Sequence, residues 1–191
     1  YKYINEPLRN KKLYRTYPDQ PNQPRHPLSA LVWYIFTGIK QLREVSGMKT
    51  GDRVVLWRGV KNKSVTDDFM KNGGAEKAPM STSRDMNVAL GYGTDGSSMD
   101  GTVLLKIVAD NELGVGADIQ WLSAFPQEAE VLYPPLAFLK PSKKEIKVLD
   151  GGGSMNIIEM RANLSSNLGL VVGESEDVGF MKGDKVCVLL D

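Results

Sequence analysis

The stretch SAFPQEAEVLYPP, residues 123–135, decides the fold of this chain. Residues 128–133 are predicted to form a short strand, which ends at Pro134 and Pro135. Because residues two apart on a strand point to the same face, Glu128 and Glu130 are expected to share a face, about 6–7 Å apart. Carboxylates this close are unfavourable unless a cation lies near them. The pair predicts either a solvated edge strand or a site where one carboxylate stabilises positive charge on a sugar and the other handles the second reactant.

A second polar segment, Arg58-Gly59, follows the β-rich run 53–57. The guanidinium of an arginine at the end of a buried strand can hold a phosphate or a carboxylate through two hydrogen bonds. A glycine beside it lets a ligand approach the backbone closely. Taken alone, the segment is also typical of a surface arginine with a turn glycine.

A third polar segment, Ser81-Thr82-Ser83, belongs to a predicted strand at 80–83. Alternation along a strand places Ser81 and Ser83 on one face and Thr82 on the other. Two hydroxyls that face a cleft can orient a neighbouring carboxylate or a ligand hydroxyl. Taken alone, this segment is equally typical of a strand whose polar side chains face water.

The composition limits the available chemistry. Apolar residues make up 41 % and charged residues 25 %, and the net charge of +1 argues against a protein that binds a nucleic-acid backbone. The length of 191 residues fits one domain and a short addition. One His and one Cys exclude a multi-His or multi-Cys zinc site and an internal disulfide. The single histidine, His26, lies in the proline-rich run 18–27 and is predicted to be a solvated loop residue.

The remaining elements follow from periodicity and from turn residues. Residues 1–49 carry a net charge of +6, which predicts a solvated basic face or a surface for an acidic partner or phosphates. Strands are predicted at 102–108 and 144–149, and a mobile loop at 91–101. No apolar run approaches the length of a membrane span. A helix is predicted over 28–46, with one core-facing stripe of Leu28, Leu31, Val32, Ile35, Ile39 and Leu42.

The two ends of the chain carry weaker signals. Residues 151–154, Gly-Gly-Gly-Ser, are predicted to be a linker, and β-like pieces follow at 156–160, 168–172 and 185–190. The chain begins without Met and without a signal-peptide pattern, so we expect a fragment of a longer protein.

Taken together and in this order, the three polar segments resemble the arginine, Ser-Thr-Ser and Glu-x-Glu motifs of the mono-ADP-ribosyltransferases. The resemblance is to the cholera-toxin-like class, of the arginine-specific type, and it extends over residues 56–60, 78–83 and 123–135. The diphtheria-toxin-like class has a histidine at the first position, where this chain has Arg58. In the family, Glu-x-Glu goes with arginine acceptors and Gln-x-Glu with others.

The resemblance implies an α+β fold, a split β-sandwich with an N-terminal helical region around an NAD cleft. Residues 1–150 would form the ADP-ribosyltransferase catalytic domain, and residues 151–191 a C-terminal β-rich extension or the start of a further module. A Rossmann fold is not implied, and the sequence has no glycine-rich dinucleotide fingerprint.

The resemblance also implies roles for the motif residues. Arg58 would hold an NAD+ phosphate, the Gly59 backbone would bind the nicotinamide amide, and Ser81 would order the site. Glu130 would bind the nicotinamide ribose and stabilise the positive charge that develops as nicotinamide leaves. Glu128 would hold or deprotonate the incoming guanidinium. Thr82 and Ser83 would complete the NAD+-binding segment.

Three aromatic residues are further candidates. Phe125 is expected to stack on the acceptor guanidinium, with Trp121 as the rival for that role. Tyr92, in the predicted loop, is a candidate to stack on nicotinamide. These assignments predict NAD+ as co-substrate, no metal, and a protein partner with an exposed arginine.

The expected function is transfer of ADP-ribose from NAD+ to protein arginine, with nicotinamide released. Two alternatives stay open: an NAD+ glycohydrolase that uses water as acceptor, and an inactive NAD-binding module. Because the secreted vertebrate members of the family are disulfide-bonded and this chain has only Cys187, an intracellular location is expected.

Overall fold

The computed structural model describes residues 2–45, 53–61, 65–94, 101–111, 114–148 and 153–164. The strands expected at 168–172 and 185–190, and Cys187, lie outside these residues. The N-terminal part contains α1 (Lys2–Arg9), η1 (Lys11–Leu13), β1 (Arg15–Tyr17), β2 (Gln20–Arg25) and α2 (Ser29–Val45). The remainder contains β3 (Val54–Val60), α3 (Asp67–Asn72), β4 (Gly74–Glu76), β5 (Met80–Ser83), α4 (Met86–Gly93), β6 (Thr102–Ala109), β7 (Ala117–Asp118), η3 (Pro126–Glu128), β8 (Glu130–Tyr133), β9 (Ala137–Val148) and β10 (Ser154–Leu164).

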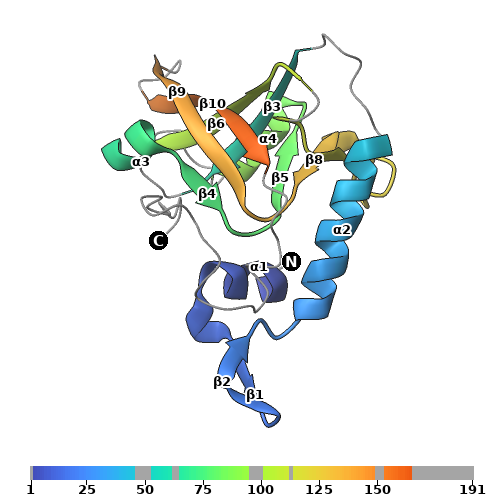
Figure 1. Ribbon diagram of the computed structural model, residues 1–191. Helices are drawn as coiled ribbons and strands as arrows, with labels where there is room; N and C mark the ends of the chain where they lie inside the picture. The colour runs from blue at the N-terminus through green and yellow to red at the C-terminus, as the bar shows by residue number, and fades with distance from the viewer. Residues whose placement is uncertain are drawn as a thin grey trace.

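Eight strands form one sheet in the order β4-β9-β10-β6-β3-β5-β8-β7 (Figure 1). The β10–β6 pair is parallel, whereas the other pairs are antiparallel. β3 pairs with β6 from Val54 to Val60, but it pairs with β5 only at Trp57 and Ser83. The sheet therefore divides between β3 and β5, and this is the split of the predicted sandwich.

One core holds the two halves of the divided sheet together. Buried apolar side chains from both halves form a single cluster that includes Leu56 of β3, Met80 of β5, Ile107 of β6, Val131 of β8 and Ile158 of β10. Burial of such side chains is the main favourable term in folding. The expected α+β fold, a split β-sandwich beside an N-terminal helical region, is confirmed.

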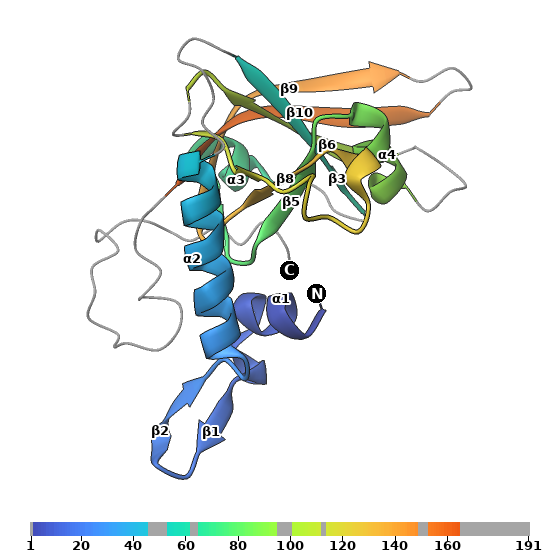
Figure 2. The ribbon, with the colours of Figure 1, turned by 90° about the vertical axis from the view of Figure 1, so that its right-hand side faces the viewer.

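The N-terminal helical region lies along one side of the sheet, and the β1–β2 hairpin lies at its far end (Figure 2). Helix α2 is tied to the sheet by Arg43, whose Nε donates to the Val115 carbonyl oxygen at 2.8 Å. Helix α1 is tied to β4, because Arg9 Nε donates to Glu76 Oε1 at 3.0 Å. The Glu76 carboxylate is buried and also accepts from the Ala78 backbone N–H at 3.0 Å.

Replacing Arg9 with Met is expected to destabilise the fold, because it leaves the buried Glu76 carboxylate without its cation. Loss of one partner of a buried ion pair costs about 3 kcal/mol. Thermal and urea unfolding of the variant would measure this loss. The matched control is Lys2→Met, since Lys2 pairs with Glu6 on the exposed side of α1. A loss for Arg9→Met no larger than for the control would contradict the role of the buried pair.

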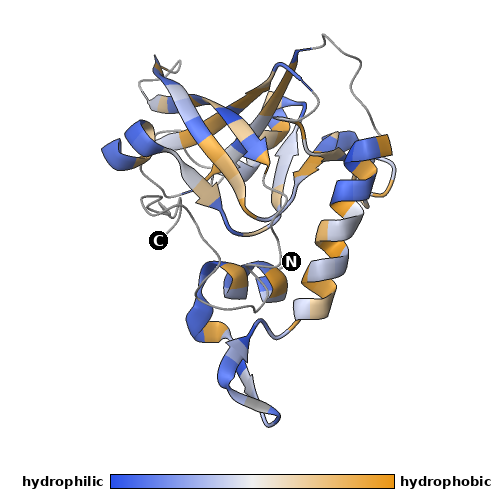
Figure 3. Ribbon diagram, viewed as in Figure 1, coloured by the Kyte–Doolittle hydropathy of each residue, from blue (hydrophilic) through white to orange (hydrophobic). Residues whose placement is uncertain are grey.

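The helix predicted at 28–46 is confirmed as α2, but its buried face differs from the predicted stripe. Val32, Phe36 and Ile39 are its buried residues, while Leu28 and Leu31 are 38 % and 44 % exposed. Figure 3 shows that hydrophobic residues occur all along this helix. Periodicity alone does not reveal which side of a broadly apolar helix meets the sheet.

The prediction of a solvated His26 is wrong. His26 is fully buried between α1 and α2. Its Nε2 donates to the Ile4 carbonyl oxygen at 2.8 Å, and its Nδ1 accepts from the Leu28 backbone N–H at 2.9 Å. Both ring nitrogens are therefore satisfied within the protein, which removes the cost of burying them. The surrounding run, predicted as loop, contains β2.

The sheet continues past residue 150. β10 lies between β9 and β6, paired antiparallel with β9 and parallel with β6. The predicted strand at 144–149 is the last part of the longer β9. Residues 154–164 thus belong to the same sheet as the motif strands. Within the described part of the chain, no helix is both long enough and apolar enough to cross a membrane.

Candidate active site

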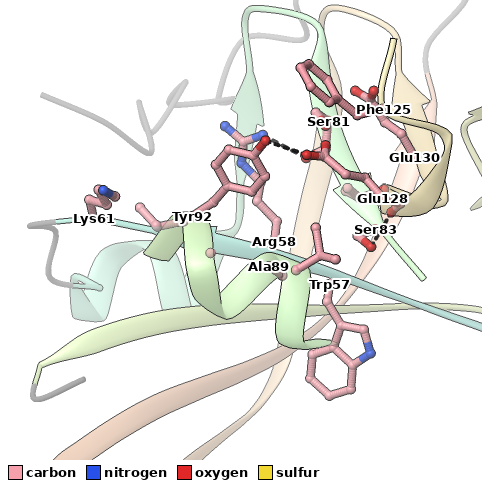
Figure 4. A pocket seen from close by; sticks show the side chains of 14 residues that line it. Trp57, Arg58, Lys61, Ser81, Ser83, Ala89, Tyr92, Phe125, Glu128 and Glu130 are labelled. Carbon is pink, nitrogen blue, oxygen red and sulfur yellow. Dashed lines mark hydrogen bonds between the residues drawn. The ribbon is translucent and has the colours of Figure 1, made fainter. Parts of the chain in front are cut away.

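A cavity of about 650 Å³ lies where the sheet divides (Figure 4). This volume is within the usual range for pockets that bind small molecules. The pocket is lined by fourteen residues from β3, β5, α4, η3, β8 and their flanks: Trp57, Arg58, Gly59, Val60, Lys61, Ser81, Thr82, Ser83, Val88, Ala89, Tyr92, Phe125, Glu128 and Glu130. Strand ends that are far apart in sequence therefore meet in one cavity.

The structure brings together nearly all the residues that the motifs singled out. The four expected catalytic residues, Arg58, Ser81, Glu128 and Glu130, all line the pocket. Trp121 does not: it is 71 % exposed and lies in a neighbouring groove with Pro126. Phe125, 57 % exposed, is the aromatic residue of this turn that lines the pocket.

The Arg58 side chain of β3 reaches β5 on the other side of the divided sheet. Its Nη1 donates to the Ser81 carbonyl oxygen at 2.8 Å, and the side chain is half-buried. Lys61, just after β3, lines the same pocket and was not anticipated, because an exposed lysine after a strand has no distinctive sequence signal. In Figure 4, Lys61 lies at the opposite end of the view from Glu128 and Glu130. The Arg58 side chain lies between Lys61 and the two glutamates in this view.

The two glutamates do not share a strand face, so that prediction is wrong. Strand β8 begins at Glu130, whereas Glu128 ends the 3₁₀-helix η3. Ala129 between them has φ 45° and ψ 51°, the left-handed conformation. Pro126 favours a helical start, and the left-handed residue then turns the chain into β8. Both carboxylates nevertheless reach the pocket, from two different elements.

Two hydroxyls of β5 hold the glutamate segment in place. Ser83 is buried; its Oγ accepts from the Asp85 backbone N–H at 2.9 Å and donates to the Glu128 carbonyl oxygen at 2.6 Å. Thr82 Oγ1 donates to the Val131 carbonyl oxygen at 2.6 Å. Ser81 differs, because its hydroxyl makes no hydrogen bond within the described part of the chain. Of the three, Ser81 has the hydroxyl that a ligand can use.

Tyr92 lies on a helix and not in a loop. It belongs to α4, which Asp85 caps by accepting from the Asn87 backbone N–H at 2.8 Å. The Tyr92 hydroxyl donates to Glu128 Oε1 at 2.7 Å. This hydrogen bond and the negative charge of Glu128 raise the pKa of the Tyr92 hydroxyl above its ordinary value. The rest of the predicted loop, residues 95–100, lies outside the described residues.

Gly59 lets α4 pack directly on β3. A Cβ at this position would lie 2.0 Å from the Ala89 carbonyl oxygen and 2.6 Å from the Gly93 nitrogen. Both neighbours are backbone atoms, so a side chain would push the helix away. The missing side chain thus sets the position of α4 and, with it, that of Tyr92.

Replacing Gly59 with Ala is therefore expected to displace α4 and to lower the free energy of unfolding by about 2 kcal/mol. Thermal unfolding would measure the loss. Gly91→Ala is the matched control on α4, since a Cβ there meets no atom within 4 Å. Equal stability of the two variants would contradict the close packing of α4 on β3.

A family model described as NAD:arginine ADP-ribosyltransferase matches residues 1–150. The chain belongs to this family. The match covers the three motif segments and the N-terminal helical region. No match was found among curated protein sequences.

Solved structures of ADP-ribosyltransferases share the fold. HopU1 of Pseudomonas syringae pv. Tomato DC3000 is 20 % identical, with a TM-score of 0.54 over 84 % of this chain and 64 % of HopU1. Plx2a, a toxin from Paenibacillus larvae, is 18 % identical, with a TM-score of 0.56 over 86 % of this chain and 80 % of Plx2a. Exoenzyme S from Pseudomonas aeruginosa, solved with human 14-3-3 protein beta and Carba-NAD, is 17 % identical, with a TM-score of 0.52 over 98 % of this chain and 76 % of the enzyme. At these identities the likeness supports the fold alone.

Proposed function

We propose that this protein transfers ADP-ribose from NAD+ to arginine side chains of a protein acceptor and releases nicotinamide. The observation that carries the proposal is the meeting of Glu128 and Glu130 with Arg58 and Ser81 in one pocket. A pair of carboxylates fits a displacement at a sugar carbon, because one can stabilise charge on the sugar while the other serves the second reactant.

The pocket fits NAD+ in size and in charge. Its volume of about 650 Å³ is adequate for a dinucleotide, and the structure of Exoenzyme S contains the analogue Carba-NAD. Arg58 and Lys61 offer cations for the two phosphates, since guanidinium and ammonium groups are the usual phosphate partners. We place the nicotinamide ribose toward Glu130.

Glu130 and Ser81 serve the bond that breaks. NAD+ supplies an ADP-ribosyl group whose bond to nicotinamide breaks with positive charge building on the ribose. Glu130 stands at the start of β8 and lines the pocket, so its carboxylate lowers the cost of that charge. Ser81, with its uncommitted hydroxyl, orders the ribose beside it.

Glu128 and Phe125 serve the acceptor. An arginine acceptor is cationic, so a carboxylate at the mouth of the pocket binds it and can take the proton that the guanidinium nitrogen loses. Phe125 offers an exposed ring for stacking on the guanidinium. Trp121 lies in the next groove, and we expect it to contact the acceptor protein beyond the modified arginine.

An assay with NAD+ and agmatine, a small guanidine, tests this function. The expected products are nicotinamide and ADP-ribosyl-agmatine. Amino acids that lack a guanidinium serve as the control and should give no adduct. Consumption of NAD+ without an agmatine adduct would contradict the arginine acceptor.

NAD+ hydrolysis is the second candidate, favoured by the partial exposure of Glu128, which lets water compete with the acceptor. It is supported if nicotinamide release persists while no protein in a broad lysate is labelled. An inactive NAD-binding module is disfavoured by the complete set of motif residues. That alternative requires NAD+ to bind in calorimetry without being consumed.

A further inference from the structure

The Tyr92 hydroxyl makes a hydrogen bond to the side chain of Glu128. The ring is 60 % exposed on α4, yet the hydroxyl donates to Glu128 Oε1 at 2.7 Å. The two residues are 36 positions apart and come from different elements, α4 and η3 (Figure 4). The contact therefore joins two sides of the pocket.

The backbone of Glu128 is already fixed by other groups. Ser83 Oγ donates to its carbonyl oxygen at 2.6 Å, and its N–H donates to the Phe125 carbonyl oxygen at 3.0 Å. The side chain is only partly buried, so its rotamers would otherwise be free, and ordering them costs entropy. A hydroxyl donor on Oε1 supplies that order and leaves Oε2 for another N–H donor.

We propose that Tyr92 is a positioning residue for the acceptor half of the reaction, because its hydroxyl orients the Glu128 carboxylate toward the incoming guanidinium. This inference rests on the proposed function, in which Glu128 receives that guanidinium. It differs from stacking on nicotinamide, which needs the ring and not the hydroxyl. The geometry of α4, set by Gly59, places the hydroxyl where this role requires it.

The protonation state of Tyr92 agrees with this role. The hydrogen bond and the charge of Glu128 raise the pKa of Tyr92, and the charge of Glu130 acts in the same direction. The hydroxyl therefore keeps its proton and remains a donor through the neutral pH range.

Tyr92→Phe tests the proposal, because it removes the hydroxyl and keeps the ring. Agmatine transfer and NAD+ hydrolysis are measured on the same samples. We expect the ratio of transfer to hydrolysis to fall about tenfold, the usual scale for losing a hydrogen bond to a charged group. Tyr34→Phe is the matched control, since Tyr34 is 72 % exposed on α2 and outside the pocket, and it should leave the ratio unchanged.

A double variant shows whether Tyr92 acts through Glu128. If it does, adding Tyr92→Phe to Glu128→Gln lowers the ratio no further. An additive loss, or an unchanged ratio in Tyr92→Phe alone, would overturn the positioning role. A wild-type protein that hydrolyses NAD+ but never modifies agmatine would instead overturn the proposed arginine acceptor, and this role with it.

A titration of Tyr92 by NMR tests the contact without any activity. The Tyr92 signal is assigned by its loss in Tyr92→Phe. Glu128→Gln removes the charge that opposes phenolate formation, so the pKa of Tyr92 should fall toward its ordinary value. An unchanged pKa would overturn the contact on which the inference rests, whatever the acceptor.

Discussion

Replacing Glu130 with alanine is expected to lower nicotinamide release by about 10³-fold, both with and without an acceptor. Glu130 is the carboxylate that we assign to the ribose, and charge develops on the ribose whether arginine or water attacks. Its loss therefore affects a step that both reactions share. The side chain stands at the edge of β8 and is only partly buried, so the variant should keep the fold.

Nicotinamide release measured by chromatography checks this expectation, alongside calorimetric binding of NAD+ to show that the variant still holds the dinucleotide. Glu145→Ala is the matched control, because Glu145 is an exposed carboxylate on β9, outside the pocket. Release from Glu130→Ala at the wild-type rate would remove Glu130 from the reaction.

Replacing Glu128 with glutamine is expected to separate the two reactions. The variant keeps the size of the side chain and removes its charge. The guanidinium of agmatine then loses the carboxylate that binds it and takes its proton. Agmatine transfer should fall about 10²-fold, the range for losing a positioned general base. Hydrolysis should persist, because Glu130 still serves the ribose.

The ratio of the two rates in Glu128→Gln is the quantity to measure. Gln127→Glu, added to Glu128→Gln, is the informative comparison. It puts a carboxylate one residue away, and we expect that carboxylate not to restore agmatine transfer. An equal loss of transfer and hydrolysis in Glu128→Gln would refute the division of roles between the two glutamates.

The sequence contained enough information to predict the fold class and the motif residues that line the pocket. Arg58, Ser81 and Glu130 come from strands with clear local patterns, and motif order linked those strands into one site. One of the predictions that failed depended on a contact distant in sequence. His26 was predicted to be solvated because its run is rich in proline, and nothing in that run indicates that the Ile4 carbonyl oxygen of α1 accepts from its ring.

The glutamate turn shows the limit of a local rule. Alternation along a strand placed Glu128 and Glu130 on one face, but the left-handed Ala129 breaks the alternation. A non-glycine residue in that conformation is uncommon and has no reliable sequence signal. Lys61 was missed because a lysine just after a strand has no distinctive local signal, and only the tertiary fold shows that it lines the pocket.

The most direct test of the account is to identify the modified residue. The protein is incubated with isotopically labelled NAD+ and a cell lysate, and the labelled proteins are analysed by mass spectrometry under fragmentation that keeps the ADP-ribose attached. The account predicts ADP-ribose on arginine side chains, absent when Glu130→Ala is used. Modification confined to other side chains, or nicotinamide release with no labelled protein, would contradict it.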